Sequence, residues 1–124
     1  MALDYSKVTD RQRLSIDDVM DSFDFEKVHQ HMINTNWGWA KPNSNDTMNL
    51  EVPDVFELKS ALRKMLVDTF SRMTLLKEEN PNIEYPISQS CGGFVVYVYP
   101  NDTCQVYFYV TSWWTEDYIF GENV

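Results

Sequence analysis

Two runs near the C-terminus, Phe94–Tyr99 and Cys104–Trp113, alternate in side-chain character, and Pro-Asn-Asp-Thr separates them. A period of two residues is typical of a strand, because successive side chains point to opposite faces. A proline, asparagine and aspartate cluster between two such runs is typical of a turn. The two runs therefore predict an antiparallel β-hairpin. Because an isolated two-stranded ribbon is only marginally stable, we expect further strands, either around Tyr85–Ser88 or from a second subunit.

The alternation gives this hairpin two different faces. One face collects aliphatic and phenyl side chains: Phe94, Val96, Val98, Val106, Phe108 and Val110. The other collects Val95, Gln105 and four tyrosines: Tyr97, Tyr99, Tyr107 and Tyr109. Aliphatic residues of one strand lie opposite aliphatic residues of the other only if the strands are joined by a three-residue loop or contain a bulge. A two-residue turn would place residues of the aliphatic set opposite residues of the tyrosine set. We expect the register that pairs aliphatic residues with one another. The tyrosine side then suits an oligomer interface, a protein partner or a stacking surface for a flat ligand, unless the N-terminal helices cover it.

Upstream of the hairpin, apolar residues recur at intervals of three and four, which predicts helices. The clearest helix begins at Pro53 and Asp54 and ends before Lys77. Its apolar stripe consists of Leu58, Leu62, Met65, Leu66, Thr69, Met73 and Leu76. Ser15 followed by Asp18 resembles a capping box and predicts an earlier helix, and Asp24 predicts the start of another helical segment. The apolar stripe must bury against the aliphatic side of the hairpin, since neither is stable in water.

These elements predict an α+β fold. Two or three N-terminal and central helices pack on a small antiparallel sheet built around the C-terminal hairpin. We expect residues 1–14 to form a flexible arm, residues 15–114 a single α+β domain, and residues 115–124 an acidic tail. The length of 124 residues fits one domain with one core.

The net charge of −9 limits the partners of the chain. A negative field repels duplex phosphates and anionic membrane surfaces, so we expect neither duplex nucleic acid nor membrane as a partner. The first residues lack the apolar run of a secretory signal. Cys91 and Cys104 fall at opposite ends of the hairpin, so no disulfide is expected. These features predict a cytoplasmic protein.

Residue types that carry catalysis do not converge in this sequence. His29 and His31 are two residues apart on a predicted helix and therefore diverge, and the two cysteines have no nearby histidine to complete a zinc cluster. Phosphate-binding loops and nucleophile elbows do not occur in the sequence. We therefore expect a binding protein with no catalytic residue, no metal and no cofactor.

Binding features concentrate at the predicted strand entry Ser90-Cys91-Gly92-Gly93-Phe94. Gly92 and Gly93 allow backbone amides to approach an anion closely. Ser88 and Ser90 supply hydroxyl donors, and Phe94 supplies a ring that could stack on a base. Two cations on the central helix are candidates to neutralise a phosphate: Arg63 and Lys64. The alternative interpretation of the two glycines is an ordinary bend at the start of a strand.

Three short elements occur in a fixed order: Asn36-Trp37-Gly38-Trp39, Pro53 followed by Glu57-Leu58, and Ser90-Cys91-Gly92-Gly93-Phe94. This order resembles small phage-encoded accessory proteins, and among them the Thoeris anti-defence family, which sequesters cyclic ADP-ribose isomers. The resemblance covers residues 25–113. Cys91 departs from it where threonine is usual, and the N-terminal arm and the loop after Trp39 are longer.

The resemblance implies a homo-oligomer with ligand sites near the subunit contacts. It implies ligand-binding roles for Gly92, Gly93 and Phe94, and by extension for Asn36, Trp37 and Trp39. The chain contains few arginines, which weighs against phosphate recognition. The alternative interpretation of the two tryptophans is an aromatic lid that caps the core.

Three functions remain open. The first is a phage-type anti-defence protein of the host cytoplasm that sequesters a small nucleotide-like immune signal. The second is an acidic inhibitor whose surface engages a basic groove on a host defence protein such as a nuclease. The third is a structural phage accessory protein, in which the tyrosine side of the hairpin is an assembly surface.

Overall fold

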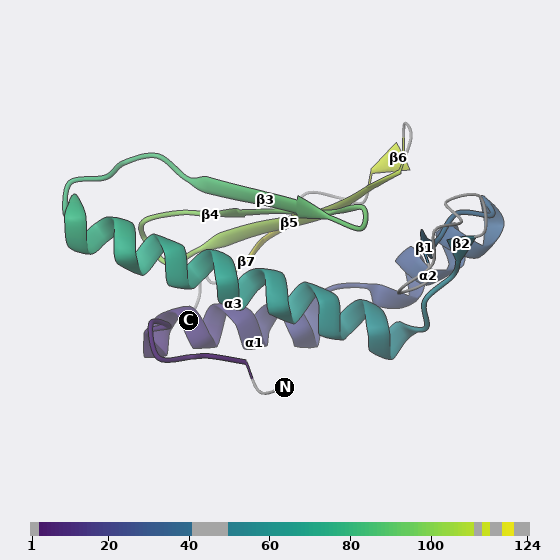
Figure 1. Ribbon diagram of the computed structural model, residues 1–124, viewed down its shortest axis with the longest axis horizontal. Coiled ribbons are helices and arrows are strands. Elements are labelled where there is room, and N and C mark those ends of the chain that lie inside the picture. The colour runs from purple at the N-terminus through teal and green to yellow at the C-terminus, as the bar shows by residue number, and fades with distance from the viewer. Residues whose placement is uncertain (1–2, 41–49, 111–112, 115–117, 121–124) are drawn as a thin grey trace. The chain divides into compact units, whose positions relative to one another are not determined.

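The computed structural model describes residues 3–40, 50–110, 113–114 and 118–120 (Figure 1). The chain forms two compact units, residues 1–23 with 62–124, and residues 24–61. The helices are α1 (Asp10–Ser22), α2 (Phe25–Asn34) and α3 (Val55–Glu79). The strands are β1 (Trp39–Ala40), β2 (Leu50–Glu51), β3 (Ile87–Cys91), β4 (Phe94–Val98), β5 (Cys104–Val110), β6 (Trp113–Trp114) and β7 (Tyr118–Phe120). The predicted α+β class is confirmed.

The first unit contains an antiparallel sheet with the strand order β3-β4-β5-β6, and β7 also pairs with β5. Its centre is the predicted hairpin of β4 and β5. Phe94 lies opposite Phe108 and Val96 opposite Val106. Residues of the aliphatic set therefore pair with one another, as the sequence predicts.

A three-residue loop produces this register. The N–H of Tyr99 donates to the carbonyl of Thr103 at 2.9 Å, and the N–H of Asp102 donates to the carbonyl of Tyr99 at 3.0 Å. Asp102, the last loop residue, has a positive φ of 70°, which is the usual arrangement for a three-residue hairpin loop that ends in a bulge. The predicted loop length and bulge are both confirmed.

Strand β3 is the additional strand that the hairpin required, and it begins at Ile87. Cys91 lies opposite Phe94, which leaves Gly92 and Gly93 as a two-residue turn. Their φ angles of 60° and 91° match a type I′ turn. A Cβ on Gly93 would lie 2.6 Å from Cε2 of Phe108. Gly93 is therefore needed both for the backbone conformation and for the packing of the ring.

One face of this sheet is buried under helices along β4 and the described side chains of β5. Its side chains are Phe94, Val96, Val98, Cys104, Val106 and Phe108, each with 0% exposure. Thr69 of α3 donates a hydrogen bond to Oε1 of Gln89 on this face at 2.9 Å, and Phe23, which ends α1, contacts Phe94 with ring centroids 6.1 Å apart. The predicted burial of the aliphatic side against the central helix is confirmed.

The buried surface of α3 is wider than the predicted stripe, because Val67 and Phe70 are also buried. Helix α3 contacts the sheet through Thr69 and contacts α1 through Thr74, which donates to Oε1 of Gln12 at 3.1 Å. Because α3 contacts both the sheet and α1, it buries side chains beyond the single apolar stripe that the sequence predicts.

Helix α1 begins six residues earlier than the sequence prediction, because its N-cap is Thr9 and not Ser15. Thr9 is the N-cap, its Oγ1 accepts from the N–H of Gln12 at 3.1 Å, and Oε1 of Gln12 accepts from the N–H of Thr9 at 3.0 Å. This reciprocal capping box is the true helix start, so Ser15 lies inside the helix and residues 10–14 are helical. Ser15 instead donates to the carbonyl of Asp102 at 2.6 Å, which ties α1 to the β4–β5 loop.

Helix α3 continues to Glu79, beyond the predicted end before Lys77. Lys77 lies in the helix, and its Nζ donates to the carbonyl of Pro100 at 2.7 Å. The N–H of Asn80 closes the last turn on Leu76 at 2.7 Å, and Pro81 then ends the helix.

The second unit contains α2, the β1–β2 pair and the first turns of α3. Asp24 caps α2 as predicted, accepting from the N–H of Lys27 at 3.0 Å. Asp54 and Glu57 form a capping box at the start of α3, where the N–H of Glu57 donates to Asp54 at 2.7 Å. The core of this unit contains Phe25, Val28, Met32 and Leu58.

Candidate functional site

The second face of the sheet in the first unit carries the candidate site. Residues directly opposite each other in a ladder point to the same face, so Ser88 and Ser90 of β3 share this face with tyrosines of β4 and β5. We define the tyrosine face as Ser88, Ser90, Val95, Tyr97, Gln105 and Tyr107. The serines are exposed and the other four side chains are partly exposed. Helices α1 and α3 lie against the opposite face, as their contacts with Phe94 and Gln89 show.

The rings on the tyrosine face hold one another in place. Tyr97 and Tyr107 are diagonal neighbours that stack, with centroids 5.9 Å apart and planes inclined by 29°. Beside them the hydroxyl of Tyr99 donates to Oε1 of Gln105 at 2.8 Å. Tyrosine offers a large apolar surface with a polar tip, and stacked rings lose little additional freedom when a partner covers them. The fourth predicted interface tyrosine, Tyr109, has a side chain outside the described residues.

A groove of about 510 Å³ lies between α3 and the start of β3. Its apolar lining comes from Leu75, Leu76 and Ile87, and Arg72 and Glu79 are its charged residues. Leu75 is 45% exposed, so its side chain is accessible from the groove. The groove therefore has an apolar lining, with the charged side chains of Arg72 and Glu79 on its helix side.

The predicted ligand-binding residues of the strand entry take structural positions. Gly92 and Gly93 form the type I′ turn, which agrees with the alternative interpretation of an ordinary bend. Phe94 has 0% exposure. Its ring packs edge to face with the ring of Phe108, and the two ring centroids are 5.1 Å apart. A fully buried ring offers no face to a base, so the stacking role predicted for Phe94 does not fit its position. Ser90 remains exposed on the tyrosine face.

The two cations predicted to meet a phosphate lie on the middle of α3. Nη1 of Arg63 is 3.8 Å from Oδ1 of Asp17 on α1 and 3.5 Å from the hydroxyl of Tyr5. Its charge is therefore directed to α1 and the N-terminal segment, and Lys64 is exposed. The cation that lines the groove is Arg72, which the sequence interpretation missed because nothing in the local pattern distinguishes it from other surface arginines.

The Asn36-Trp37-Gly38-Trp39 element belongs to the second unit, where it ends α2. Asn36 has a positive φ of 54°. The N–H of Trp37 donates to the carbonyl of Met32 at 3.1 Å, and the N–H of Asn36 to Ile33 at 3.3 Å. These two bonds form a Schellman motif with asparagine in the left-handed position, so Asn36 has a structural role.

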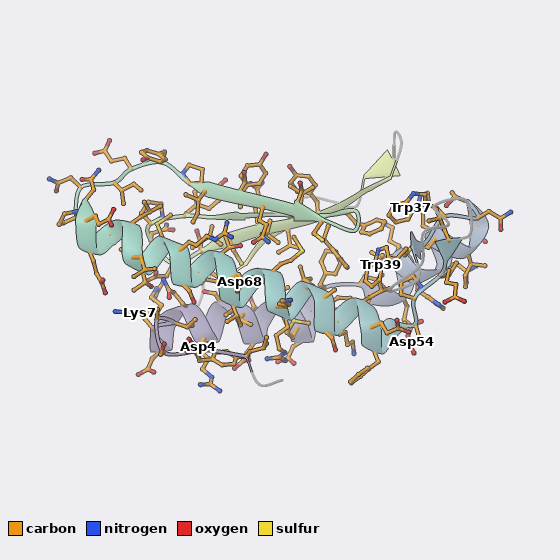
Figure 2. All side chains as sticks on the ribbon, in the orientation of Figure 1. Asp4, Lys7, Trp37, Trp39, Asp54 and Asp68 are labelled. Carbon is orange, nitrogen blue, oxygen red and sulfur yellow. The ribbon has the colours of Figure 1, made fainter. Side chains whose placement is uncertain are left out.

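Gly38 and the two tryptophans complete this second unit. A Cβ on Gly38 would collide with the backbone of Glu51, the residue that pairs with Trp39 across β1 and β2. Trp37 and Trp39, both labelled in Figure 2, are partly exposed. Partial exposure suits the interpretation of the tryptophans as a lid, and it leaves their predicted ligand role untested.

Two ionisable groups have pKa values moved by burial. Burial lowers the pKa of His31. Burial, with a smaller contribution from Asp18, raises the pKa of the Cys104 thiol to about 12. Cys91 is exposed and Cys104 is buried, and both are free thiols as predicted. Among the described residues, no three side chains of metal-binding type gather, and no helix there is long and apolar enough to span a membrane.

Comparisons with protein-family models, with curated proteins and with solved structures find no match to this chain. The geometry of the tyrosine face and the groove is therefore the basis for a functional proposal.

Proposed function

We propose that this chain is a binding protein that engages a protein partner through the tyrosine face. The observation that supports this most directly is the partial exposure of Tyr97 and Tyr107 on the sheet face opposite α1 and α3. Aromatic residues, tyrosine among them, are enriched in protein interfaces. Two stacked tyrosines flanked by Val95 and Gln105 have the composition of an interface centre.

The charge of the chain indicates the chemistry of that partner. A protein with a net charge of −9 associates fastest with a basic surface. The nucleic-acid groove of a host defence nuclease has this chemistry, so inhibition of such a protein is the form of the function that we propose. Its location would be the cytoplasm, which is supported by the two free thiols.

The test is capture of a basic partner by the immobilised chain over a series of salt concentrations. We expect one stoichiometric protein, whose recovery falls steeply as ionic strength rises. The double variant Tyr97→Ser, Tyr107→Ser should lose it. Leu14→Ser is the matched control, because Leu14 is 52% exposed on α1. Equal recovery by the tyrosine variant and the control would reject the tyrosine face as the binding site.

Sequestration of a nucleotide-like ligand is our second candidate function. It is supported by the groove, whose volume of about 510 Å³ is within the range of small-molecule sites and whose lining includes Arg72 and Ser88. Isothermal titration against cyclic nucleotides and ADP-ribose cyclisation products tests it, and Arg72→Gln should weaken any binding. Absence of heat with every compound at micromolar concentration would reject this candidate.

A further inference from the structure

Strand β3 forms an edge of the sheet in the first unit. In the strand order β3-β4-β5-β6, β3 has β4 on one side and no strand from the described residues on the other. Natural proteins protect such edges with lysine, proline or a bulge. The segment Ile87–Cys91 contains none of the three: its sequence is Ile-Ser-Gln-Ser-Cys and its pairing with β4 is continuous.

The turn geometry identifies which backbone groups face the open edge. In a two-residue hairpin the flanking residues, here Cys91 and Phe94, exchange both backbone hydrogen bonds. Because bonded and non-bonded pairs alternate along an antiparallel ladder, Gln89 is also bonded to β4. The N–H and C=O groups of Ser88 and Ser90 therefore point away from β4. Both serines are exposed, so these groups are accessible for pairing.

The groove lies beside this edge and supplies a place for side chains. Ile87 and Ser88 of β3 line it together with residues of α3. A strand added to β3 would point alternate side chains toward opposite faces of the sheet. One set would extend the tyrosine face, and the other would lie over Leu75 and Leu76 in the groove.

Charge around the groove indicates the kind of segment that fits. Asp68, Glu79 and Glu84 are exposed, and none of the three has an ion pair with another residue of the described ranges. Asp68 precedes Arg72 by one turn on α3 (Figure 2). Glu79 lines the groove together with Arg72, and Glu84 lies in the segment before β3. These carboxylates, in a chain with a net charge of −9, favour a cationic segment.

We propose that β3 binds an extended segment of a protein partner as an additional strand. The segment pairs with the backbone of Ser88 and Ser90 and inserts an apolar side chain into the groove. From the same face of the added strand it presents lysine or arginine to Asp68 and Glu79 on α3. This inference rests on the proposed function only in that the partner is a protein, because it uses the backbone of β3 and the groove and not the rings of Tyr97 and Tyr107. Strand addition of this kind obtains affinity from main-chain hydrogen bonds and specificity from alternate side chains.

The test is titration of the isotope-labelled full chain with a short peptide, followed by amide NMR. In the peptide, serine alternates with a central valine and flanking lysines, so that valine and lysine share one face of the added strand. We expect the largest shifts at Ser88 and Ser90, with smaller shifts at Arg72 and Leu75. Ser88→Pro should weaken binding by about tenfold or more, because it removes an outward N–H while the ladder to β4 keeps its bonds. The control Tyr107→Ser should bind as the unaltered chain does.

Two further peptides keep the test decisive if Ser88→Pro does not fold. A peptide N-methylated at alternate amides retains composition and charge but cannot pair along its edge, and a version with glutamate for lysine reverses the charge. Both should bind at least about tenfold more weakly than the parent peptide.

Several outcomes would overturn this inference. They are equal binding of either altered peptide, shifts confined to Tyr97 and Tyr107, and no shift with the parent peptide at millimolar concentration. Concentration-dependent shifts at β3 without any peptide would assign the edge to a second copy of the chain. Displacement of the peptide by a cyclic nucleotide would assign the groove to the second candidate function. Loss of strand addition leaves the proposed function intact if the tyrosine variants still lose the captured partner.

Discussion

Replacement of Gly93 by alanine tests the packing that separates the two faces of the sheet. Gly93 has a φ of 91°, a conformation that costs an L-residue about 1–2 kcal/mol. The new Cβ would lie 2.6 Å from Cε2 and 2.7 Å from Cζ of Phe108. Phe108 is fully buried against Phe94, so its ring must shift, and overpacking of this kind costs about 1–3 kcal/mol. The two contributions together destabilise the fold by about 2–5 kcal/mol.

The assay is urea unfolding followed by tryptophan fluorescence. With an unfolding slope of about 1–3 kcal/mol per molar urea, the midpoint should fall by at least about 0.7 M. Gly92→Asn is the matched control. It creates the Asn-Gly pair preferred in a type I′ turn, and asparagine tolerates a φ of 60°. It should remain within about 0.5 kcal/mol of the unaltered chain. Equal stability of Gly93→Ala and Gly92→Asn would refute the turn geometry.

Three further predictions concern buried polar groups. Gln12→Leu should lower the free energy of unfolding by about 1–3 kcal/mol in the same urea assay, because it removes the hydrogen bonds to Asp102 and Thr74. Iodoacetamide near neutral pH should alkylate Cys91 in the folded chain and Cys104 only after unfolding, as read by peptide mass spectrometry, because burial holds the Cys104 pKa at about 12. The ring of His31 should titrate below pH 6.5 by NMR. Since the unfolded state then binds the proton more readily, the stability of the second unit should fall as pH drops through 6.5 toward the folded pKa.

The sequence predicted the fold wherever the pattern was local and repeated. Alternation over two strands was enough to assign the register of β4 and β5, because a shift by one residue would have exposed the aliphatic set. The start of α1 was missed because two capping signals compete near the N-terminus. Thr9 with Gln12 forms the reciprocal box, whereas Ser15 is used to bind the β4–β5 loop.

The candidate site was only partly accessible to sequence reasoning. The tyrosine face followed from the same alternation that gave the register. Phe94 illustrates a conflict within the sequence interpretation, because alternation placed it with Val96 on the buried side while the Gly-Gly-Phe element gave it a ligand role. Burial is the stronger constraint, since the sheet cannot form with that ring turned outward. The groove could not be predicted, because it depends on how far α3 lies from the edge of β3.

We propose that a partner binds to the sheet face opposite α1 and α3. The most direct measurement places a photo-crosslinking amino acid at Tyr107, and separately at Leu14 on α1, in the cells where the chain acts. We predict one basic protein crosslinked in high yield from position 107 and none in comparable yield from position 14. Crosslinks to the same proteins in equal yield from both positions, or none from position 107, would contradict the claim.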